Sequence, residues 1–92
     1  MTPNTAITVK ITGRVQGVWF RGWTRQEATR LGLEGWVRNE ADGSVAACLS
    51  GTVARVDEMV ALLHKGPPAA RVDLVEVHPS PAPKTQGFVV LR

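Results

Sequence analysis

The chain of 92 residues is 43% hydrophobic and 21% charged, a composition that excludes a disordered protein, and its short apolar runs exclude a membrane-spanning segment. This length leaves room for a single domain over residues 1–92, built around one two-layer core. The net charge of +3 is uneven, since residues 1–39 carry +4 and residues 40–92 carry −1, and this bias favours an anionic partner, either a small phosphate ester or a nucleic acid.

The first two predicted elements are a strand and a helix. Every second residue is apolar over residues 6–12, which is the pattern of a half-buried strand. Residues 23–31 follow helical spacing, and Gly32 comes next, at the position where a left-handed residue ends many helices. The residues expected on the buried face of this helix are Phe20, Thr24, Ala28 and Leu31.

Two further strands, over residues 33–39 and 44–50, are predicted to form an antiparallel hairpin. The Asp42-Gly43 pair between them is a strong turn signal. Cys48 falls on the face opposite to the apolar residues of its strand, and we interpret it as a packing residue rather than a nucleophile. A lone cysteine and the lack of a readable secretory signal after Met1 predict a cytoplasmic location.

The last predicted elements are a helix and two strands. Thr52 is the expected capping residue of the helix, and Gly66 with the two prolines after it ends it. Strands over residues 72–77 and 88–91 flank a proline-rich loop. The residues of this helix expected to face the core are Val53, Val56, Val60 and Leu63.

The resulting order is β-α-β-β-α-β with a small added strand. It predicts an α+β fold of the ferredoxin-like, split βαβ type, in which two helices pack on one face of a mainly antiparallel sheet of about four to five strands. This plan hosts unrelated activities, so the function has to be argued from the residues.

The segment GRVQGVWFR, residues 13–21, connects the first strand to the first helix. Gly13 and Gly17 allow sharp turns and close approach of a ligand, the helix N-terminus offers unpaired N–H groups, and Arg21 can bind two phosphate oxygens. The segment lacks the motifs of P-loops and of dinucleotide sites, so nucleotide hydrolysis is not supported. From these residues alone it is either an anion-binding loop or a tight turn with a solvated arginine.

Two longer segments favour the first interpretation. ITGRVQGVWFR (residues 11–21) and GWVRNEADGSVAACLSG (residues 35–51) resemble the two signature segments of the acylphosphatases, and the spacing AxxLGLxGWVRN over residues 28–39 is similar too. The resemblance implies a ferredoxin-like fold and the hydrolysis, without metal or cofactor, of small-molecule acyl phosphates to a carboxylate and inorganic phosphate. The absence of tyrosine and the loop over residues 79–86 are less typical of the family.

The same resemblance implies roles for individual residues. It assigns phosphate binding to Arg21 and the orientation of the attacking water to Asn39, whereas spacing alone favours a turn-forming asparagine at that position. Tryptophans such as Trp19, Trp23 and Trp36 are more often packing than binding residues, so Trp19, which stands inside the loop, either packs or walls the site. The loop residues to which the resemblance assigns phosphate binding are Arg14, Val15, Gln16, Gly17, Val18, Trp19 and Phe20.

Other interpretations have less support. A module of the RNA-recognition type needs aromatic stacking residues in mid-sheet, and no RNP-like segment occurs. A domain of a larger maturation protein is disfavoured because the chain ends at Arg92. His64 and His78 lack carboxylates at metal-binding spacing, so no metal site is expected. We therefore expect a monomer that binds neither nucleic acid nor membrane.

Overall fold

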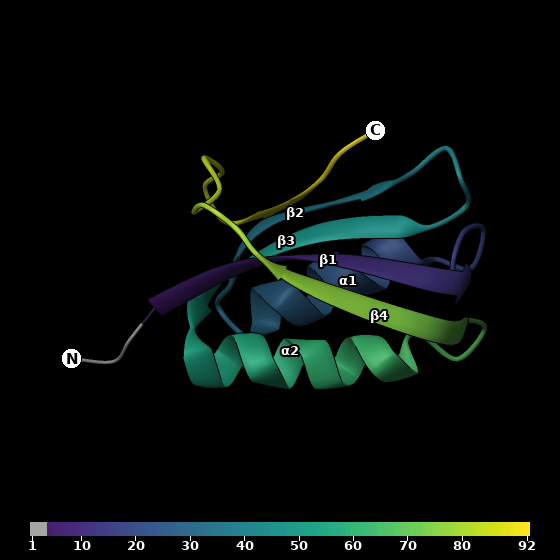
Figure 1. The fold of residues 1–92 in the computed structure, drawn as a ribbon, viewed down its shortest axis with the longest axis horizontal. Coiled ribbons are helices and arrows are strands. Elements are labelled where there is room, and N and C mark those ends of the chain that lie inside the picture. Colours follow the sequence, from purple (N-terminus) through teal and green to yellow (C-terminus); the bar gives the residue numbers. More distant parts are fainter. Residues whose placement is uncertain (1–3) are drawn as a thin grey trace.

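The structure, a computed structural model, describes residues 4–92 as two helices and a five-stranded sheet (Figure 1). Within these residues no helix has the length and apolar character needed to cross a membrane. The order of elements is the predicted one. In chain order they are β1 (Asn4–Arg14), α1 (Phe20–Arg30), β2 (Glu34–Asn39), β3 (Val45–Thr52), α2 (Val53–Lys65), β4 (Arg71–Pro79) and β5 (Phe88–Val90).

The strands form one sheet in the order β4-β1-β3-β2-β5. Antiparallel pairs join β1 to both β3 and β4, and β2 to β3. The short β5 instead runs parallel to β2, with Val90 opposite Val37. Both β1 and β2 run antiparallel to β3, which lies between them, so β1 and β2 end at the same edge of the sheet. Residues that follow these two strands can therefore meet at that edge. The sheet order is that of the predicted ferredoxin-like fold.

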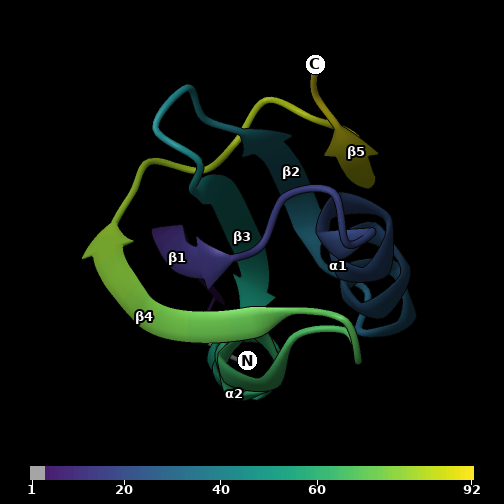
Figure 2. The same cartoon turned by 90° about the vertical axis from the view of Figure 1, so that its right-hand side faces the viewer.

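Both helices cover the same face of the sheet, as the end-on view shows (Figure 2). Alternate residues of the central strands point at this face, and the apolar stripes of the helices cover them. Fully burying one such side chain stabilises the fold by roughly 1.5 to 3 kcal/mol. The core side chains with least exposure include Ile11, Phe20, Ala28, Val37, Ala47, Leu49, Met59 and Leu63.

The helices differ in two details from their sequence-based description. α1 begins at Phe20 rather than at residue 23, because Trp19 adopts a left-handed conformation and serves as the N-cap. In α2, capped by Thr52 as predicted, Met59 lies at the centre of the buried stripe, whereas Val53 is 40% exposed. At 3.6 residues per turn, Val53 lies roughly 60° from Val56 and roughly 120° from Met59 around the helix, so it falls on the margin of the buried stripe.

The segment between β4 and β5 crosses the sheet on the side away from the helices (Figure 2). The Ser80 N–H donates to the carbonyl of Ala6 at 3.1 Å, and the Thr85 hydroxyl donates to the carbonyl of Gly35 at 3.1 Å. This crossing covers Cys48, whose Sγ lies 4.0 Å from the Ser80 hydroxyl oxygen. Burial raises the pKa of the Cys48 thiol, which agrees with its interpretation as a packing residue.

Candidate active site

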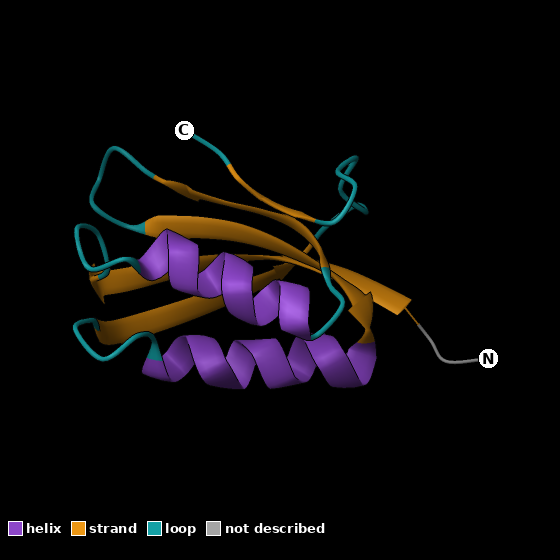
Figure 3. Ribbon diagram, turned by 180° about the vertical axis from the view of Figure 1, so that it is seen from behind, coloured by secondary structure: helices purple, strands orange, loops and turns teal. Residues whose placement is uncertain are grey.

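A cavity of about 660 Å³ opens beside the first turn of α1. It lies at the end of the molecule where the β1–α1 connection and the β2–β3 hairpin turn are both found (Figures 1 and 3). The lining therefore comes from segments that are distant in the sequence. The lining residues are Val15, Gly17, Trp19, Phe20, Arg21, Gly22, Asn39, Val90 and Arg92.

The β1–α1 connection and the first turn of α1 leave backbone N–H groups beside this cavity without a partner in the described residues. Gly17 and Trp19 have φ angles of 73° and 63°, the latter uncommon for a bulky residue. Trp19 makes no side-chain capping hydrogen bond, and the first helical bond runs from the Trp23 N–H to the Trp19 carbonyl at 3.0 Å. The N–H groups of residues 20–22 thus have no acceptor within the helix. They lie at the positive end of its dipole and suit an anion.

Gly13 has a different role from the one that its sequence context suggested. It lies at an irregularity in the pairing of β1 with β4, with a φ of 135°. A Cβ atom at this position would collide with the carbonyl oxygen of Arg71 on β4. Gly13 is therefore required for the close approach of two strands, and of the two glycines in residues 13–21 only Gly17 lines the cavity.

Arg21 is a half-buried residue of the first turn of α1 and lines the cavity. It forms no ion pair with another described residue, whereas Arg30 is paired with Glu27 at 2.8 Å and Arg38 with Glu40 at 3.0 Å. Its guanidinium thus remains available to a bound anion, next to the uncapped N–H groups of the same turn.

Asn39 is the last residue of β2 and contributes to the same cavity. The turn after it is held by Asp42, whose Oδ1 accepts from the Ser44 N–H at 2.9 Å and from the Ser44 hydroxyl at 2.6 Å. The turn therefore uses the carboxylate of Asp42, and the Asn39 amide is not one of the side chains that hold it. An amide can both donate to and accept from a water molecule.

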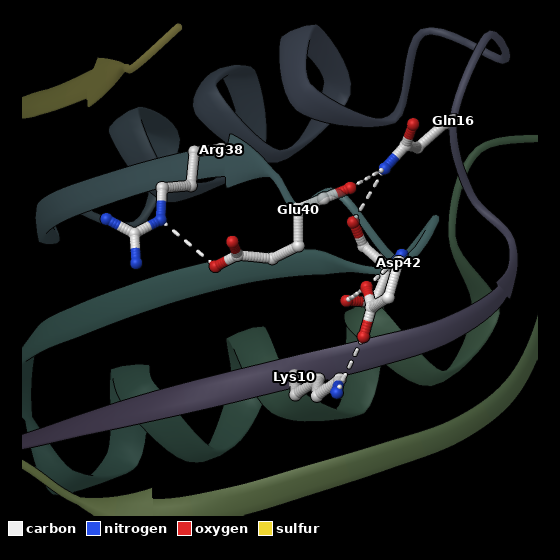
Figure 4. A network of polar contacts seen from close by, with 6 residues as sticks. Lys10, Gln16, Arg38, Glu40 and Asp42 are labelled. Carbon is white, nitrogen blue, oxygen red and sulfur yellow. Dashed lines mark hydrogen bonds and ion pairs between the residues drawn. The ribbon is translucent and has the colours of Figure 1, made fainter.

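Gln16 links the loop to the hairpin (Figure 4). Its Nε2 donates to the carbonyl oxygens of Glu40 and Ser44, each at 2.8 Å. The bond to Glu40 fixes the residue that directly follows Asn39. The two acceptors lie 24 and 28 residues further along the chain, so no local sequence signal indicated this contact.

Charged residues of the hairpin pair with each other, as Arg38 does with Glu40, or with β1, as Asp42 does with Lys10 (Figure 4). Lys10 Nζ lies 2.9 Å from Asp42 Oδ2, and the Arg38 guanidinium carbon lies 4.7 Å from the centre of the Trp36 ring. The hydrogen bonds from Ser44 and then the contact with Lys10 hold the pKa of Asp42 well below its usual range. These contacts occupy the carboxylates of Asp42 and Glu40. No acidic residue of the described chain lines the cavity, so no acidic side chain there competes for the guanidinium of Arg21.

The structure brings together six of the nine residues that the resemblance assigned. Arg21, Asn39, Val15, Gly17, Trp19 and Phe20 line one cavity. Val15 and Phe20 have core side chains, so only their backbone is available there. The other three residues do not line the cavity. Arg14 is the last residue of β1, the Gln16 amide donates to the hairpin, and Val18 packs against the core.

Val90 and Arg92 line the cavity and were not predicted. They arrive there because β5 runs parallel to β2, which places the residues after Val90 alongside Asn39. The Leu91 N–H donates to the Val37 carbonyl at 2.8 Å and continues this pairing. The sequence indicated a final strand but neither its neighbour nor its direction.

Comparison with known proteins identifies the family of this chain. The family model described as acylphosphatase matches residues 7–90. The chain belongs to the acylphosphatase family. It is 52% identical over 80 residues to an acylphosphatase of Rhizorhabdus wittichii, which covers 87% of this chain and 81% of that protein. It is 53% identical over 88 residues to an acylphosphatase of Rhizobium meliloti, which covers 95% of this chain and 93% of that one.

Solved acylphosphatases share the fold. The structure of an acylphosphatase from Coxiella burnetii superposes with a TM-score of 0.91 at 34% identity, covering 96% of this chain and 93% of that one. The protein is therefore an acylphosphatase: it hydrolyses the carboxyl-phosphate bond of small-molecule acyl phosphates to a carboxylate and inorganic phosphate.

The described part of this acylphosphatase contains no group of three His, Cys, Asp or Glu side chains placed to hold a metal ion. Its histidines, His64 on α2 and His78 on β4, are both exposed and line neither the cavity nor the hairpin. The groups at the cavity that suit an anion are the uncapped backbone N–H groups and the arginines.

Proposed function

We propose that this acylphosphatase works without a metal ion, by direct attack of an oriented water on a bound phosphoryl group. In this mechanism the N–H groups of the loop over residues 14–20 and the Arg21 guanidinium hold the three non-bridging oxygens. The Asn39 amide orients the water opposite to the leaving carboxylate. Phosphoryl transfer depends mainly on positioning and on charge stabilisation, which these groups supply.

The leaving group explains why so few side chains suffice. A carboxylate has a conjugate acid with a pKa of about 4, so it departs without being protonated. No general acid is needed. A simple alkyl phosphate has an alkoxide leaving group that does require a proton, and we expect little activity on such esters.

One observation carries this proposal. Arg21 and Asn39, from the first turn of α1 and the last residue of β2, line the same cavity beside a helix N-terminus that no side chain caps. A cation, free N–H groups and a water-binding amide are thus gathered at one place. This is the set of groups that the reaction needs and that the family resemblance assigned.

The test is phosphate release from benzoyl phosphate and from acetyl phosphate in the presence of excess chelator. We expect full turnover with chelator and little release from an alkyl phosphate ester. Activity that chelator abolishes and a divalent cation restores would contradict the proposal.

We also propose that the enzyme is a monomeric single domain over residues 1–92 and acts in the cytoplasm. The single core around one sheet and the lone buried cysteine support this. Light scattering of the purified protein and one cooperative unfolding transition are the expected results. A stable dimer, or two separate transitions, would contradict it.

A further inference from the structure

The active-site cavity continues into a second hollow along α1. This hollow has a volume of about 630 Å³, and Trp19, Gly22 and Val90 line both cavities. The remaining lining residues of the second hollow are Arg25, Gln26 and Thr29. At 1.5 Å of rise per residue, the stretch of α1 from residue 22 to residue 29 gives it a length of about 10 Å.

Trp19 stands at the junction of the two cavities and is 64% exposed. Its left-handed backbone conformation is unfavourable for a bulky residue, and a ring so exposed gains little from packing against the core. A Cβ atom at Gly22 would collide with the indole Nε1. The glycine therefore lets the ring lie against the first turn of α1, with a large part of its surface open.

Arg25 lies one helical turn after Arg21 and forms no ion pair with another described residue. No acidic residue lines the second hollow, and the neighbouring Glu27 is already paired with Arg30 at 2.8 Å. A guanidinium without a partner can form a planar, two-point contact with a carboxylate.

We propose that the hollow along α1 is the subsite for the acyl group. It would take acyl phosphates whose acyl part is planar, stacks on the Trp19 ring and carries a carboxylate that reaches Arg25. This inference rests on the proposed function, because a phosphoryl group held by the loop and Arg21 leaves the acyl group to extend past Trp19. Because Trp19, Gly22 and Val90 line both cavities, the acyl group extends from the phosphate site along α1.

The contribution of the ring is tested with the ratio of kcat/KM for benzoyl phosphate to kcat/KM for acetyl phosphate, since acetyl phosphate has no ring to stack. Trp19→Asn removes the ring, and asparagine tolerates the left-handed conformation. Gly22→Ala keeps the ring but displaces it. We expect both variants to lower the ratio about fivefold, and Trp36→Asn, outside both cavities, to leave it unchanged.

The contribution of Arg25 is tested by comparing 4-carboxybenzoyl phosphate with benzoyl phosphate. We expect Arg25→Gln to lower the preference for the carboxylated substrate about tenfold. Arg55→Gln makes the same change of charge on α2, outside both cavities, and should preserve the preference.

The two proposals fail in different ways. If Trp19→Asn and Gly22→Ala leave the ratio of kcat/KM for benzoyl phosphate to acetyl phosphate unchanged, while hydrolysis still requires Arg21, the acyl subsite alone is overturned. A dimer that dissociates on Trp19→Asn without a change in the ratio would assign the ring to self-association and overturn it too. Hydrolysis that does not fall when Arg21 is replaced would instead overturn the proposed phosphate site.

Discussion

Arg21 differs from the paired arginines of the molecule in its surroundings rather than in its charge. Arg30, Arg38 and Arg71 each lie within 3.1 Å of a carboxylate on a neighbouring residue. Arg21 lies instead beside uncapped N–H groups at the cavity. In such a place the planar fork of the guanidinium, and not its charge alone, decides how a phosphoryl group is held.

Replacing Arg21 by lysine keeps the charge and removes this geometry. Losing one preorganised contact of this kind costs about 2.7 to 4 kcal/mol, so we expect Arg21→Lys to lower kcat/KM by roughly a hundredfold or more. Phosphate binding should weaken as well. The measurement is steady-state hydrolysis of benzoyl phosphate by protein shown to be folded, with Arg55→Lys as the control. A folded variant that kept more than about a third of the activity, a loss of under about 1 kcal/mol, would make Arg21 an ordinary helix-end charge.

Asn39 should affect the rate more than the binding. A water that it orients contributes to the transition state and little to the affinity for the ground state, so Asn39→Ala should lower kcat strongly with a modest change in KM. The hairpin should survive, because Asp42 and Gln16 hold its turn. Single-turnover and steady-state kinetics separate the two effects, and an unchanged kcat would return Asn39 to a purely structural role.

At the scale of elements, Gln16 couples the loop to the hairpin through two hydrogen bonds of 2.8 Å. Each such bond contributes about 0.5 to 1.5 kcal/mol, so Gln16→Ala should lower the free energy of unfolding by about 1 to 3 kcal/mol. The loop and the end of β2 would then move independently, and kcat should fall about tenfold or more. Inhibition by phosphate, which needs only the loop and Arg21, should change less.

Urea unfolding and steady-state kinetics check this expectation, with Gln86→Ala in the exposed crossing segment as the control. Equal losses of kcat and of phosphate affinity would mean that Gln16 shapes the loop itself. A loss of stability with no change in kcat would confine its role to the fold.

The hairpin should also give the protein a pH dependence of its stability. The unfolded chain has an aspartate pKa of about 3.9, and Ser44 and Lys10 hold the pKa of Asp42 below this in the folded protein. As the pH falls, the unfolded state takes up the proton first, so the contribution of Asp42 is present above about pH 5 and is lost progressively below about pH 4.

Urea midpoints of the protein and of Asp42→Asn test this at several pH values. The variant should be less stable at pH 7 and should approach the unmodified protein at about pH 2. A difference that persists unchanged at low pH would mean that the shape of the turn, rather than the charge of Asp42, stabilises the hairpin.

The elements themselves were largely predictable, because apolar periodicity and turn residues are local signals. The alternation of apolar and polar residues over residues 6–12 predicted β1, and the Asp42-Gly43 pair predicted the hairpin turn. Trp19 as the N-cap of α1 was not predicted, because a left-handed tryptophan has no sequence signature. The place of Gly13 beside β4 was missed because it depends on a contact with Arg71, far along the chain.

At the scale of the whole molecule, the site depends on the order of the strands. From the sequence, only the family resemblance connected Arg21 with Asn39. In the sheet, β3 lies between β1 and β2, and the β1–α1 connection and the β2–β3 turn lie at the same end of the molecule (Figure 3), which brings the two residues to one cavity. Val90 and Arg92 enter the site through the parallel pairing of β5, and Gln16 through bonds to the hairpin. These contacts lie between distant residues, which local patterns do not report.

Because the cavity is lined by the β1–α1 connection, the end of β2 and the C-terminal residues, it forms only in the folded protein, and its occupation should stabilise the fold. A ligand that binds only the native state adds RT ln(1 + [L]/Kd), which is about 2.7 kcal/mol at a hundred times its Kd. In a domain of this size each kcal/mol shifts Tm by about 4 to 8 °C. Inorganic phosphate, as the product, should therefore raise Tm by about 10 °C or more at that concentration, and it should inhibit hydrolysis competitively.

Thermal unfolding monitored by circular dichroism, with sodium chloride at matched ionic strength as the reference, measures the shift in Tm. Arg21→Lys should show a much smaller shift at the same phosphate concentration, because its fold is intact while its phosphate site is weakened. An equal rise in Tm for both proteins would place the stabilising phosphate away from Arg21, and purely noncompetitive inhibition would separate the phosphate site from that of the substrate. A shift that disappears in Arg21→Lys, together with competitive inhibition, ties the unfolding equilibrium to the same pocket that carries out hydrolysis.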